Sequence, residues 1–289
     1  MNSEKKFKTV NLNDNTYPAL LKEIFDPPPT LMTKGVMPDI KRPHLAVVGS
    51  RKASPYGKEA TRSLVGALAR AGVVIVSGLA YGIDQAAHKA TMDAGGTTVA
   101  VLGFGIDFKC TYREQKLRDN IIKSNGAIIS EFQPKEPGHK SNFPKRNRVI
   151  SGICQGTLII EAAERSGSLI TARMAMQQNR DVFAVPGPIT SQTSKGTNNL
   201  LKDGAFPVTC AKDILRILGV EVSDKKPSQV PNLSAPENTI LNTLSDKPTH
   251  IDDIARANNS PINVIAVLLT SLEIAGHIKD IGGGNFVIK

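Results

Sequence analysis

HLAVVGSRKASPYGKEATRSLVGALARAGVVIVSG, residues 44–78, places a helical pattern between two short apolar runs. The runs at 44–48 and 73–76 are almost continuously apolar, which is typical of strands covered on both faces. Between them Ala60, Leu64 and Leu68 recur at helical spacing, and Gly72 marks the helix stop. The stretch therefore predicts a strand, a helix and a second, parallel strand.

The same alternation continues along the chain. Four further apolar runs, each followed or preceded by a helical pattern, are TTVAVLG (97–103), AIISE (127–131), TLIIEAA (157–163) and DVFAVPG (181–187). Six strands with crossing helices predict an α/β fold, a Rossmann-like doubly wound parallel sheet over residues 43–219.

The two ends of the chain follow other patterns. Residues 1–42 predict an irregular N-terminal extension with a short helix in NTYPALLKEI, residues 15–24. Residues 220–235 mix charge, Ser and Pro without apolar periodicity, which indicates a linker.

Residues 236–289 predict a small winged-helix domain. Helical patterns lie near 237–244, 250–257 and 261–275, and HIKDIGGGNFVIK follows them. The central glycines of that last stretch are typical of a hairpin loop between two short strands.

The net charge of +10 is unevenly distributed. Residues 1–235 hold 32 Lys and Arg against 20 Asp and Glu, whereas residues 236–289 hold 4 against 6. A basic surface on the large domain fits a polyanionic partner. The alternative from composition alone is a solubilising surface charge.

Cysteine usage and hydropathy indicate the compartment. Cys110, Cys154 and Cys210 form no CxxC pair and have no His at ligand spacing, which predicts neither disulfide nor zinc site and favours a reducing compartment. The start MNSEKKFKTVNLND lacks an apolar stretch, and no later apolar run approaches the roughly 18 residues of a membrane helix. We expect a soluble cytoplasmic protein with no membrane partner.

Small residues gather where the predicted strands end. Ligands of open parallel sheets bind at the carboxyl ends of the strands, and a helix N-terminus there favours an anion. A strand, a Gly/Ser turn and a helix start recur at Gly49-Ser50-Arg51-Lys52, at Ser77-Gly78-Leu79-Ala80-Tyr81-Gly82-Ile83-Asp84 and at Arg165-Ser166-Gly167-Ser168. One such turn is more often only a tight turn, but three in register predict phosphate binding. Without a GxGxxG or GxxxxGK[ST] motif, no nucleotide cofactor is predicted.

A basic segment, KEPGHKSNFPKRNRVISG at 135–152, follows the fourth strand. Alone it would indicate a solvated helix face. Beside the phosphate-binding loops it predicts a track for a phosphodiester backbone, with Phe143 available to stack on a base. Its cations are Lys135, Lys140, Lys145, Arg146 and Arg148, against the single acid Glu136.

Six ordered motifs within residues 12–210 closely resemble the DNA-processing protein A (DprA/Smf) family. They are GSRKASPYG, SGLAYGIDQAAH, NFPKRNRVISG, SGSLITA, VFAVPG and SKGTNNLLKDGA. The resemblance implies a domain that dimerises, binds single-stranded DNA without sequence preference and helps load the RecA recombinase during natural transformation. Many members begin with a helical SAM-like domain, for which this chain is too short at its N-terminus.

The resemblance, together with the basic segment, gives a set of DNA-binding residues and no catalytic residue. The set is Gly49, Ser50, Arg51, Ser77, Gly78, Lys140, Phe143, Lys145, Arg146, Arg148, Ser166, Gly167, Ser168 and Asn198.

Several polar residues nearby have structural explanations. Asp84 and His88, four apart on one helix, are expected to cap or pack that helix. Asn147 is expected to fix its loop. Glu131 and Glu161, at the ends of buried strands, are expected to orient Arg or Lys side chains.

Two rival functions remain. The fold also resembles lysine-decarboxylase-like nucleotide phosphoribohydrolases, but EAAERSGSLITA (161–172) lacks the glutamate placement of their PGGxGTxxE signature, so no general acid or base is evident. A duplex-DNA reader is disfavoured because PINVIAVLLTSLEIAGH (261–277) has no Lys or Arg and suits a protein contact better.

Overall fold

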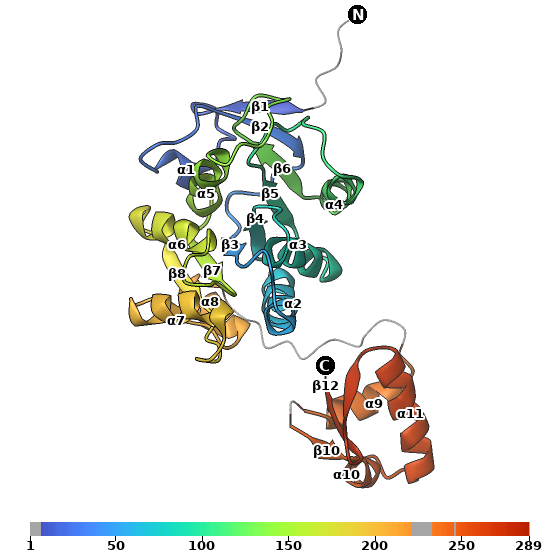
Figure 1. Ribbon diagram of the computed structural model, residues 1–289. Helices are drawn as coiled ribbons and strands as arrows, with labels where there is room; N and C mark the ends of the chain where they lie inside the picture. Colours follow the sequence, from blue (N-terminus) through green and yellow to red (C-terminus); the bar gives the residue numbers. More distant parts are fainter. Residues whose placement is uncertain (1–6, 221–232, 246, 289) are drawn as a thin grey trace, which may run out of the picture. The chain divides into compact units, whose positions relative to one another are not determined.

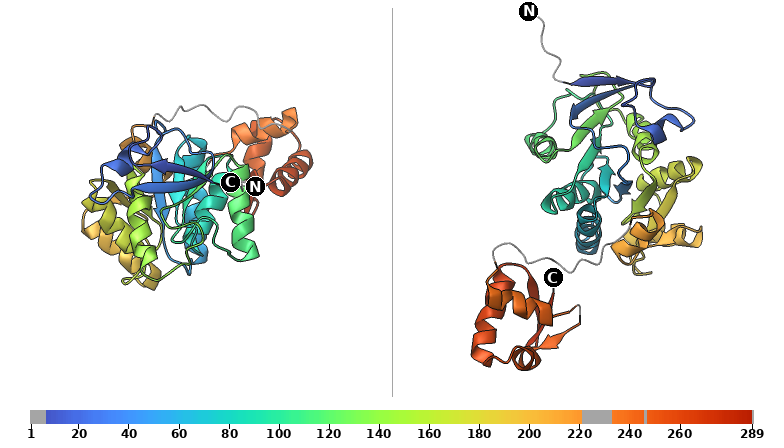
Figure 2. Two further views of the ribbon diagram at one scale, coloured as in Figure 1. Left: turned by 90° about the horizontal axis from the view of Figure 1, so that it is seen from above. Right: turned by 180° about the vertical axis from the view of Figure 1, so that it is seen from behind.

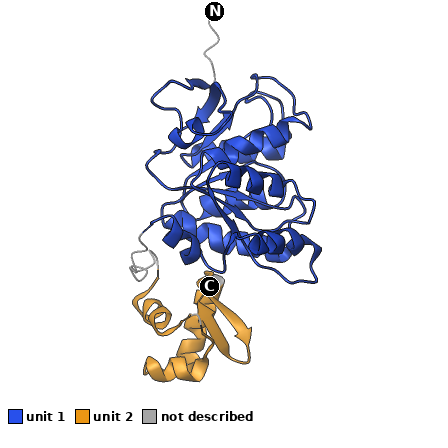
Figure 3. Ribbon diagram, turned by 90° about the vertical axis from the view of Figure 1, so that its left-hand side faces the viewer, with its two compact units in different colours: residues 1–222 blue, residues 223–289 orange. Residues whose placement is uncertain are grey.

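A computed structural model describes residues 7–220, 233–245 and 247–288. The chain divides into two compact units, Met1–Val222 and Ser223–Lys289 (Figure 3). Most of the predicted linker lies outside the described residues, and α9 already begins at Ala235.

The sheet of the first unit confirms the predicted doubly wound topology. Its parallel strands are β3 (His44–Val48), β4 (Val74–Ser77), β5 (Thr98–Val101), β6 (Ala127–Ser130), β7 (Gly156–Ile159) and β8 (Asp181–Ala184). They lie in the order β6-β5-β4-β3-β7-β8. The chain moves outward from β3 to β6 and then places β7 on the other side of β3, so the topological switch point lies between β3 and β7.

The N-terminal residues belong to this sheet, and the expectation of an irregular extension was wrong. β1 (Lys8–Asn11) pairs antiparallel with β2 (Thr30–Gly35), and β2 pairs antiparallel with β6. α1 (Ala19–Lys22) is the short helix predicted within residues 15–24. A two-residue strand, β9 (Phe206–Pro207), extends the opposite edge beside β8.

Helices cover both faces of the sheet (Figures 1 and 2). On one face Leu45 and Val47 pack with residues of α2 (Pro55–Arg70), α3 (Ile83–Asp93) and α8 (Ala211–Ile217), and α4 (Tyr112–Lys123) covers the neighbouring strands. On the other, Ala46 and Val48 pack with residues of α1, α5 (Asn142–Gly152), α6 (Ser168–Gln177) and α7 (Lys195–Lys202), which the 3₁₀ helix η1 (Gln192–Ser194) precedes. Burial on both sides explains the continuous apolar runs of the strands.

The second unit is the predicted winged helix. It consists of α9 (Ala235–Thr243), β10 (Thr249–His250), α10 (Ile251–Ala257), α11 (Ile262–Ile274), β11 (Ile278–Gly282) and β12 (Asn285–Ile288). The strands form a sheet in the order β10-β12-β11, and Gly283 and Gly284 turn the hairpin with φ of 63° and 76°. Ile240, Ile254 and Leu269 lie in its buried core.

None of the described helices is long and apolar enough to cross a bilayer. The three cysteines are free thiols. Over the same described residues, no group of three or more His, Cys, Asp and Glu side chains is arranged to hold a metal ion.

Candidate nucleic-acid interface

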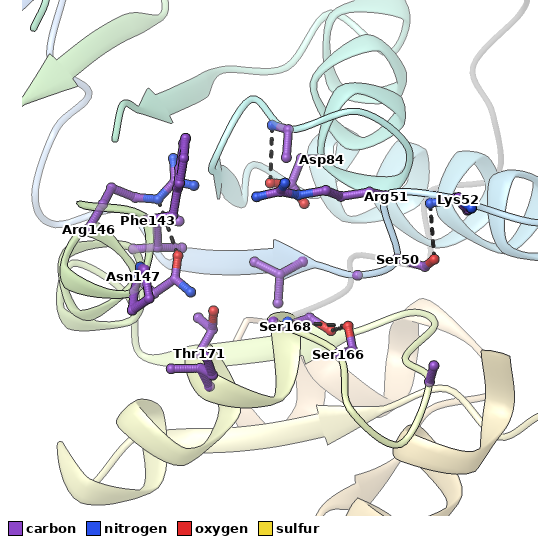
Figure 4. A pocket seen from close by; sticks show the side chains of 18 of the residues that line it. Ser50, Arg51, Lys52, Asp84, Phe143, Arg146, Asn147, Ser166, Ser168 and Thr171 are labelled. Carbon is purple, nitrogen blue, oxygen red and sulfur yellow. Dashed lines mark hydrogen bonds between the residues drawn. The ribbon is translucent and has the colours of Figure 1, made fainter. Parts of the chain in front are cut away.

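A cavity of about 620 Å³ lies at the switch point, beyond the carboxyl ends of β3 and β7. Its walls come from the loop after β3, from α5 and from the start of α6 (Figure 4). The predicted site residues that line it are Gly49, Ser50, Arg51, Lys140, Phe143, Arg146, Ser166, Gly167 and Ser168.

Positive charge borders the cavity at two depths. Arg51, Lys52 and Lys140 are exposed at its rim. Arg146 is only 5% exposed, and its Nη1 donates hydrogen bonds to the carbonyl oxygens of Gly78, at 2.7 Å, and Val101. Burial lowers the pKa of Arg146 to about 10, so the side chain still carries its charge at neutral pH. The cavity thus has a buried, hydrogen-bonded cation inside and exposed cations at its rim.

Asp84 is the carboxylate of this cavity. Its Oδ2 accepts hydrogen bonds from the backbone N–H groups of Gly78, at 3.1 Å, and Ala80, at 3.4 Å. Burial raises the pKa of Asp84 to about 6, and the charge of Arg146 opposes that rise. Asp84 therefore fixes the loop after β4, which contains Leu79 at φ 62°.

Gly78 separates the two charged groups. A Cβ at this position would lie 2.8 Å from the guanidinium carbon of Arg146 and 2.8 Å from Oδ2 of Asp84. Any side chain would push the pair apart. His88, the other polar residue predicted on α3, is fully buried with Nδ1 2.7 Å from Thr98 Oγ1. The expected packing role of His88 is confirmed, whereas Asp84 does not cap α3 and instead holds the preceding loop beside the cavity.

The start of α2 is closed to an external anion. Glu161 accepts hydrogen bonds from Ser54 N at 2.9 Å, from Ser54 Oγ at 2.5 Å and from Thr193 Oγ1 at 3.0 Å. Ser54 Oγ in turn accepts from Gly57 N at 3.0 Å. The expectation that Glu161 orients a basic side chain was therefore wrong, because its carboxylate occupies the N-terminal end of this helix instead.

The start of α6 differs from that of α2. Its N-cap, Gly167, contributes no side chain, and the hydroxyl oxygens of Ser166 and Ser168 lie 2.7 Å apart on the cavity wall (Figure 4). Ser166 Oγ accepts from Ser168 N at 3.3 Å. Hydroxyl donors at a helix start suit a phosphate oxygen, so this is the anion position that the structure supports best among the three predicted loops.

Phe143 supplies an aromatic wall. The guanidinium carbon of Arg51 lies 5.4 Å from the ring centroid, and a Cβ at Gly103 would lie 2.7 Å from the ring edge. Phe143 also borders a smaller hollow of about 170 Å³ next to the cavity. The Phe143 ring packs on Gly103, and the Arg51 guanidinium lies over the ring. A base could stack on the ring in place of this guanidinium or next to it.

Family models match both units. One described as DNA recombination-mediator protein A matches residues 8–219, and one described as the DprA winged helix domain matches residues 224–284. The chain belongs to the DNA recombination-mediator protein A family. Protein Smf of Escherichia coli K12 is 40% identical over 277 residues, which cover 93% of this chain and 74% of Smf. DNA processing protein DprA of Streptococcus pneumoniae R6 is 43% identical over 211 residues, which cover 73% of this chain and 74% of that protein.

Solved structures of the family agree with this fold. The crystal structure of DNA processing protein A from Streptococcus pneumoniae has a TM-score of 0.68 and 42% identity, covering 73% of this chain and 74% of that one. The protein from Helicobacter pylori, whose structure is described as giving insights into a unique single-stranded DNA binding mode, has a TM-score of 0.64 and 29% identity. That match covers 75% of this chain and 98% of that one.

Two basic residues of the predicted set do not line the cavity: Arg148, which the family resemblance implied, and Lys145, which the basic segment supplied. Arg148 donates to Glu131 at 2.5 Å and lies 3.4 Å from Asp26, and Lys145 lies 4.0 Å from Glu131. Positions two apart on a helix point about 200° apart, so Arg146 and Arg148 cannot share one side of α5. The expected role of Glu131 in orienting basic side chains is confirmed.

Three further family positions also lie elsewhere. Ser77 is fully buried, and its hydroxyl donates to the Val47 carbonyl at 2.6 Å. The Asn198 side chain accepts from Gly187 N at 3.2 Å and donates to Gly187 O at 3.0 Å, which pins the loop after β8. Gly78 borders the smaller hollow rather than the cavity.

Some cavity residues were missing from the predicted set. Asn147 is one of them, and its Oδ1 accepts from Arg146 Nε at 3.2 Å, so it orients the buried cation. Asn147 follows Phe143 by four positions on α5, a spacing that would have identified it. The other polar or charged ones are Lys52, Asp84 and Thr171.

Proposed function

We propose that the first unit binds single-stranded DNA, without sequence preference, in the cavity at the switch point. The observation that carries the proposal is the convergence of cations with an aromatic ring on one recess: Arg51, Lys52, Lys140 and Arg146 with Phe143. The cations suit phosphates and the ring suits a base, and neither contact depends on base identity.

The dimensions of the recess favour a single strand over a duplex. A volume of about 620 Å³ is within the range of small-ligand pockets, roughly 300–1,000 Å³, which suits a few unpaired nucleotides. Phe143 is half-buried, so only an unpaired base can reach its ring. The described binding mode of the Helicobacter pylori relative supports the same ligand.

Titration of the full chain tests this proposal. Single-stranded DNA, duplex DNA of equal length and mononucleotides would be titrated at several salt concentrations. We expect the single strand to bind most tightly and its affinity to fall steeply with salt. Equal affinity for the duplex would contradict the proposal.

We propose further that the protein acts as a binding mediator and not as an enzyme. Glu161 is 2% exposed, accepts three hydrogen bonds and does not line the cavity, so it is no counterpart of the phosphoribohydrolase glutamate. Asp84 has a pKa suited to proton transfer, but its bonds to Gly78 N and Ala80 N explain its burial. Release of base or phosphate from a nucleotide panel, abolished by Asp84→Asn, would establish the enzyme alternative instead.

From the family resemblance we propose that the protein forms a homodimer, protects incoming or exposed strands in the cytoplasm and helps load RecA, as in natural transformation and recombination. Two cavities in one particle would raise avidity for a long strand. Light scattering at micromolar concentration, with and without DNA, tests the dimer. RecA loading is tested by the delay before RecA hydrolyses ATP on strands coated with single-strand-binding protein. The protein should shorten this delay, and an unchanged delay would contradict the proposal.

A further inference from the structure

A second hollow, of about 690 Å³, runs between α3 and α4 and begins beside the start of α2. The two helices lie next to each other on one face of the sheet (Figures 1 and 2). The basic residues that line this α3–α4 groove are Lys58, Lys89, Arg113, Lys116 and Lys123, and Asp93 is the acidic one.

The helical spacing of these residues concentrates their charge. Arg113, Lys116, Asn120 and Lys123 follow one another at intervals of three and four residues, so they form one stripe along α4. Lys89 faces this stripe from α3.

Acidic neighbours do not neutralise the stripe. Asp119 precedes Lys123 by four positions, but its Oδ1 accepts from Gln115 Nε2 at 2.8 Å. Within the described residues, the groove cations make no side-chain hydrogen bond or ion pair, unlike Lys34, which lies 2.5 Å from Asp107. Unpaired like charges facing one hollow repel one another, and a polyanion relieves that repulsion.

Residues of the smaller hollow connect the cavity with the groove along the chain. The smaller hollow shares Arg51, Phe143 and Arg146 with the cavity and is also lined by Tyr81 and Glu114. Tyr81 is followed in the chain by Gly82, and Glu114 is preceded by Arg113, and both Gly82 and Arg113 line the groove. Tyr81, which is 51% exposed, therefore lies between the residues of the cavity and the stripe on α4 in this series of lining residues.

We propose that the α3–α4 groove binds the phosphodiester backbone of the DNA segment that leaves the cavity past Tyr81. From Arg113 to Lys123 the stripe extends about 15 Å, at 1.5 Å per residue, enough to face several phosphates. This inference rests on the proposed single-stranded DNA function and adds a second, purely electrostatic section to its binding path.

The test compares two strand lengths and two triple variants. A thymidine trinucleotide fills the cavity alone, whereas a thymidine dodecanucleotide also reaches the groove. The groove variant is Lys89→Gln/Lys116→Gln/Lys123→Gln. Its matched control is Lys8→Gln/Lys22→Gln/Lys41→Gln, which removes the same charge from exposed positions that line neither the cavity nor the groove. Thermal unfolding confirms that both variants are folded.

We expect the groove variant to bind the trinucleotide normally and the dodecanucleotide about 100-fold more weakly at 0.1 M salt, with a salt slope lower by about 0.7 per lost contact. Tyr81→Ala should weaken only dodecanucleotide binding, by roughly 5-fold or more, with an unchanged slope. Equal losses in the groove and control variants would overturn the groove. Failure of the unsubstituted protein to bind either strand would instead overturn the proposed function, and the groove with it.

Discussion

One helix of each unit borders a candidate binding surface, and the two helices differ in chemistry. α5 brings Phe143 and Arg146 to a cavity, with Lys140 just before its start. α11 exposes apolar side chains instead, since Ile262 is 52% and Val267 70% exposed, and it contains no Lys or Arg. The proposed nucleic-acid site therefore lies outside the unit that has the helix-turn-helix outline.

The difference lies in what supports the charges. In the first unit backbone carbonyls hold a buried guanidinium and backbone amides hold a buried carboxylate, so a charged recess is part of the fold. The second unit has fewer basic than acidic residues, and the exposed face of α11 suits a protein contact. The predictions below separate these two roles, beginning with the largest effect.

The strongest test removes the buried cation. Arg146→Ala leaves the Gly78 and Val101 carbonyls without this donor and removes the positive charge near the Asp84 carboxylate. We therefore expect the free energy of unfolding to fall by about 3–5 kcal/mol. Denaturant unfolding measures this loss. Lys145→Ala is the control, because its side chain is 56% exposed and its removal should cost less than about 0.5 kcal/mol. Equal effects would show that the recess is not part of the folded framework.

The second prediction concerns pH. Burial raises the pKa of Asp84 from 3.8 to about 6, so the folded state binds the proton more tightly than the unfolded state. The contribution of Asp84 to stability is therefore fully present below pH 3.8 and is lost as the pH rises through 6. Relative to Asp84→Asn, the free energy of unfolding should fall by roughly 2–3 kcal/mol between pH 4 and pH 7. If the difference in free energy of unfolding between the protein and Asp84→Asn stays constant across this range, the pKa of Asp84 is not raised by burial.

These two predictions concern residues whose roles the sequence alone could not assign. The apolar runs identified β3 to β8 because both faces of those strands are buried. The sequence did not predict β1 and β2, because KTVN and TLMTKG are short and mix polar with apolar residues. β2 joins the sheet through β6, which is distant in the chain, and such a pairing is not encoded in local periodicity.

The site was predicted to a similar extent. The Gly/Ser loops and the basic segment located the cavity, because strand ends converge in any parallel sheet. Which cation faces inward was not predicted, since Arg146 and Arg148 lie in the same motif but on different sides of α5. Nor could charge pattern show that Glu161 occupies the start of α2, because that contact joins residues 107 positions apart.

The third prediction tests base stacking in the first unit. Phe143→Ala should weaken single-stranded DNA binding by about 1–3 kcal/mol, because one stacked base loses its platform. The salt slope should stay the same, since a ring releases no counterion. Phe143→Tyr retains the ring and should bind normally in the same fluorescence titration. A parallel loss in both variants would argue for a packing role on Gly103 instead.

The fourth prediction concerns the exposed cations of the rim. Arg51→Ala and Lys140→Ala should each lower the salt slope by about 0.7 and the affinity by about 1 kcal/mol at 0.1 M salt, equally for all sequences. Lys145→Ala is again the matched control, because Lys145 faces Glu131 and does not line the cavity. If the salt slope falls equally for all three variants, DNA binding depends on the general surface charge and not on the cations of the rim.

The smallest effect is expected from removal of the whole second unit. Residues 236–289 carry 4 Lys and Arg against 6 Asp and Glu, and α11 has no basic side chain. Truncation after Pro231 therefore removes few phosphate contacts that could release counterions on binding. We expect the affinity for single-stranded DNA to change by less than about 0.5 kcal/mol and the salt slope to stay constant. Each unit has its own buried core, so the remaining unit should unfold at an unchanged denaturant midpoint. That midpoint distinguishes lost contacts from lost folding: weaker binding with an unchanged midpoint would place DNA contacts in the second unit. The assignment of DNA binding to the first unit and of a protein contact to the second unit would then fail.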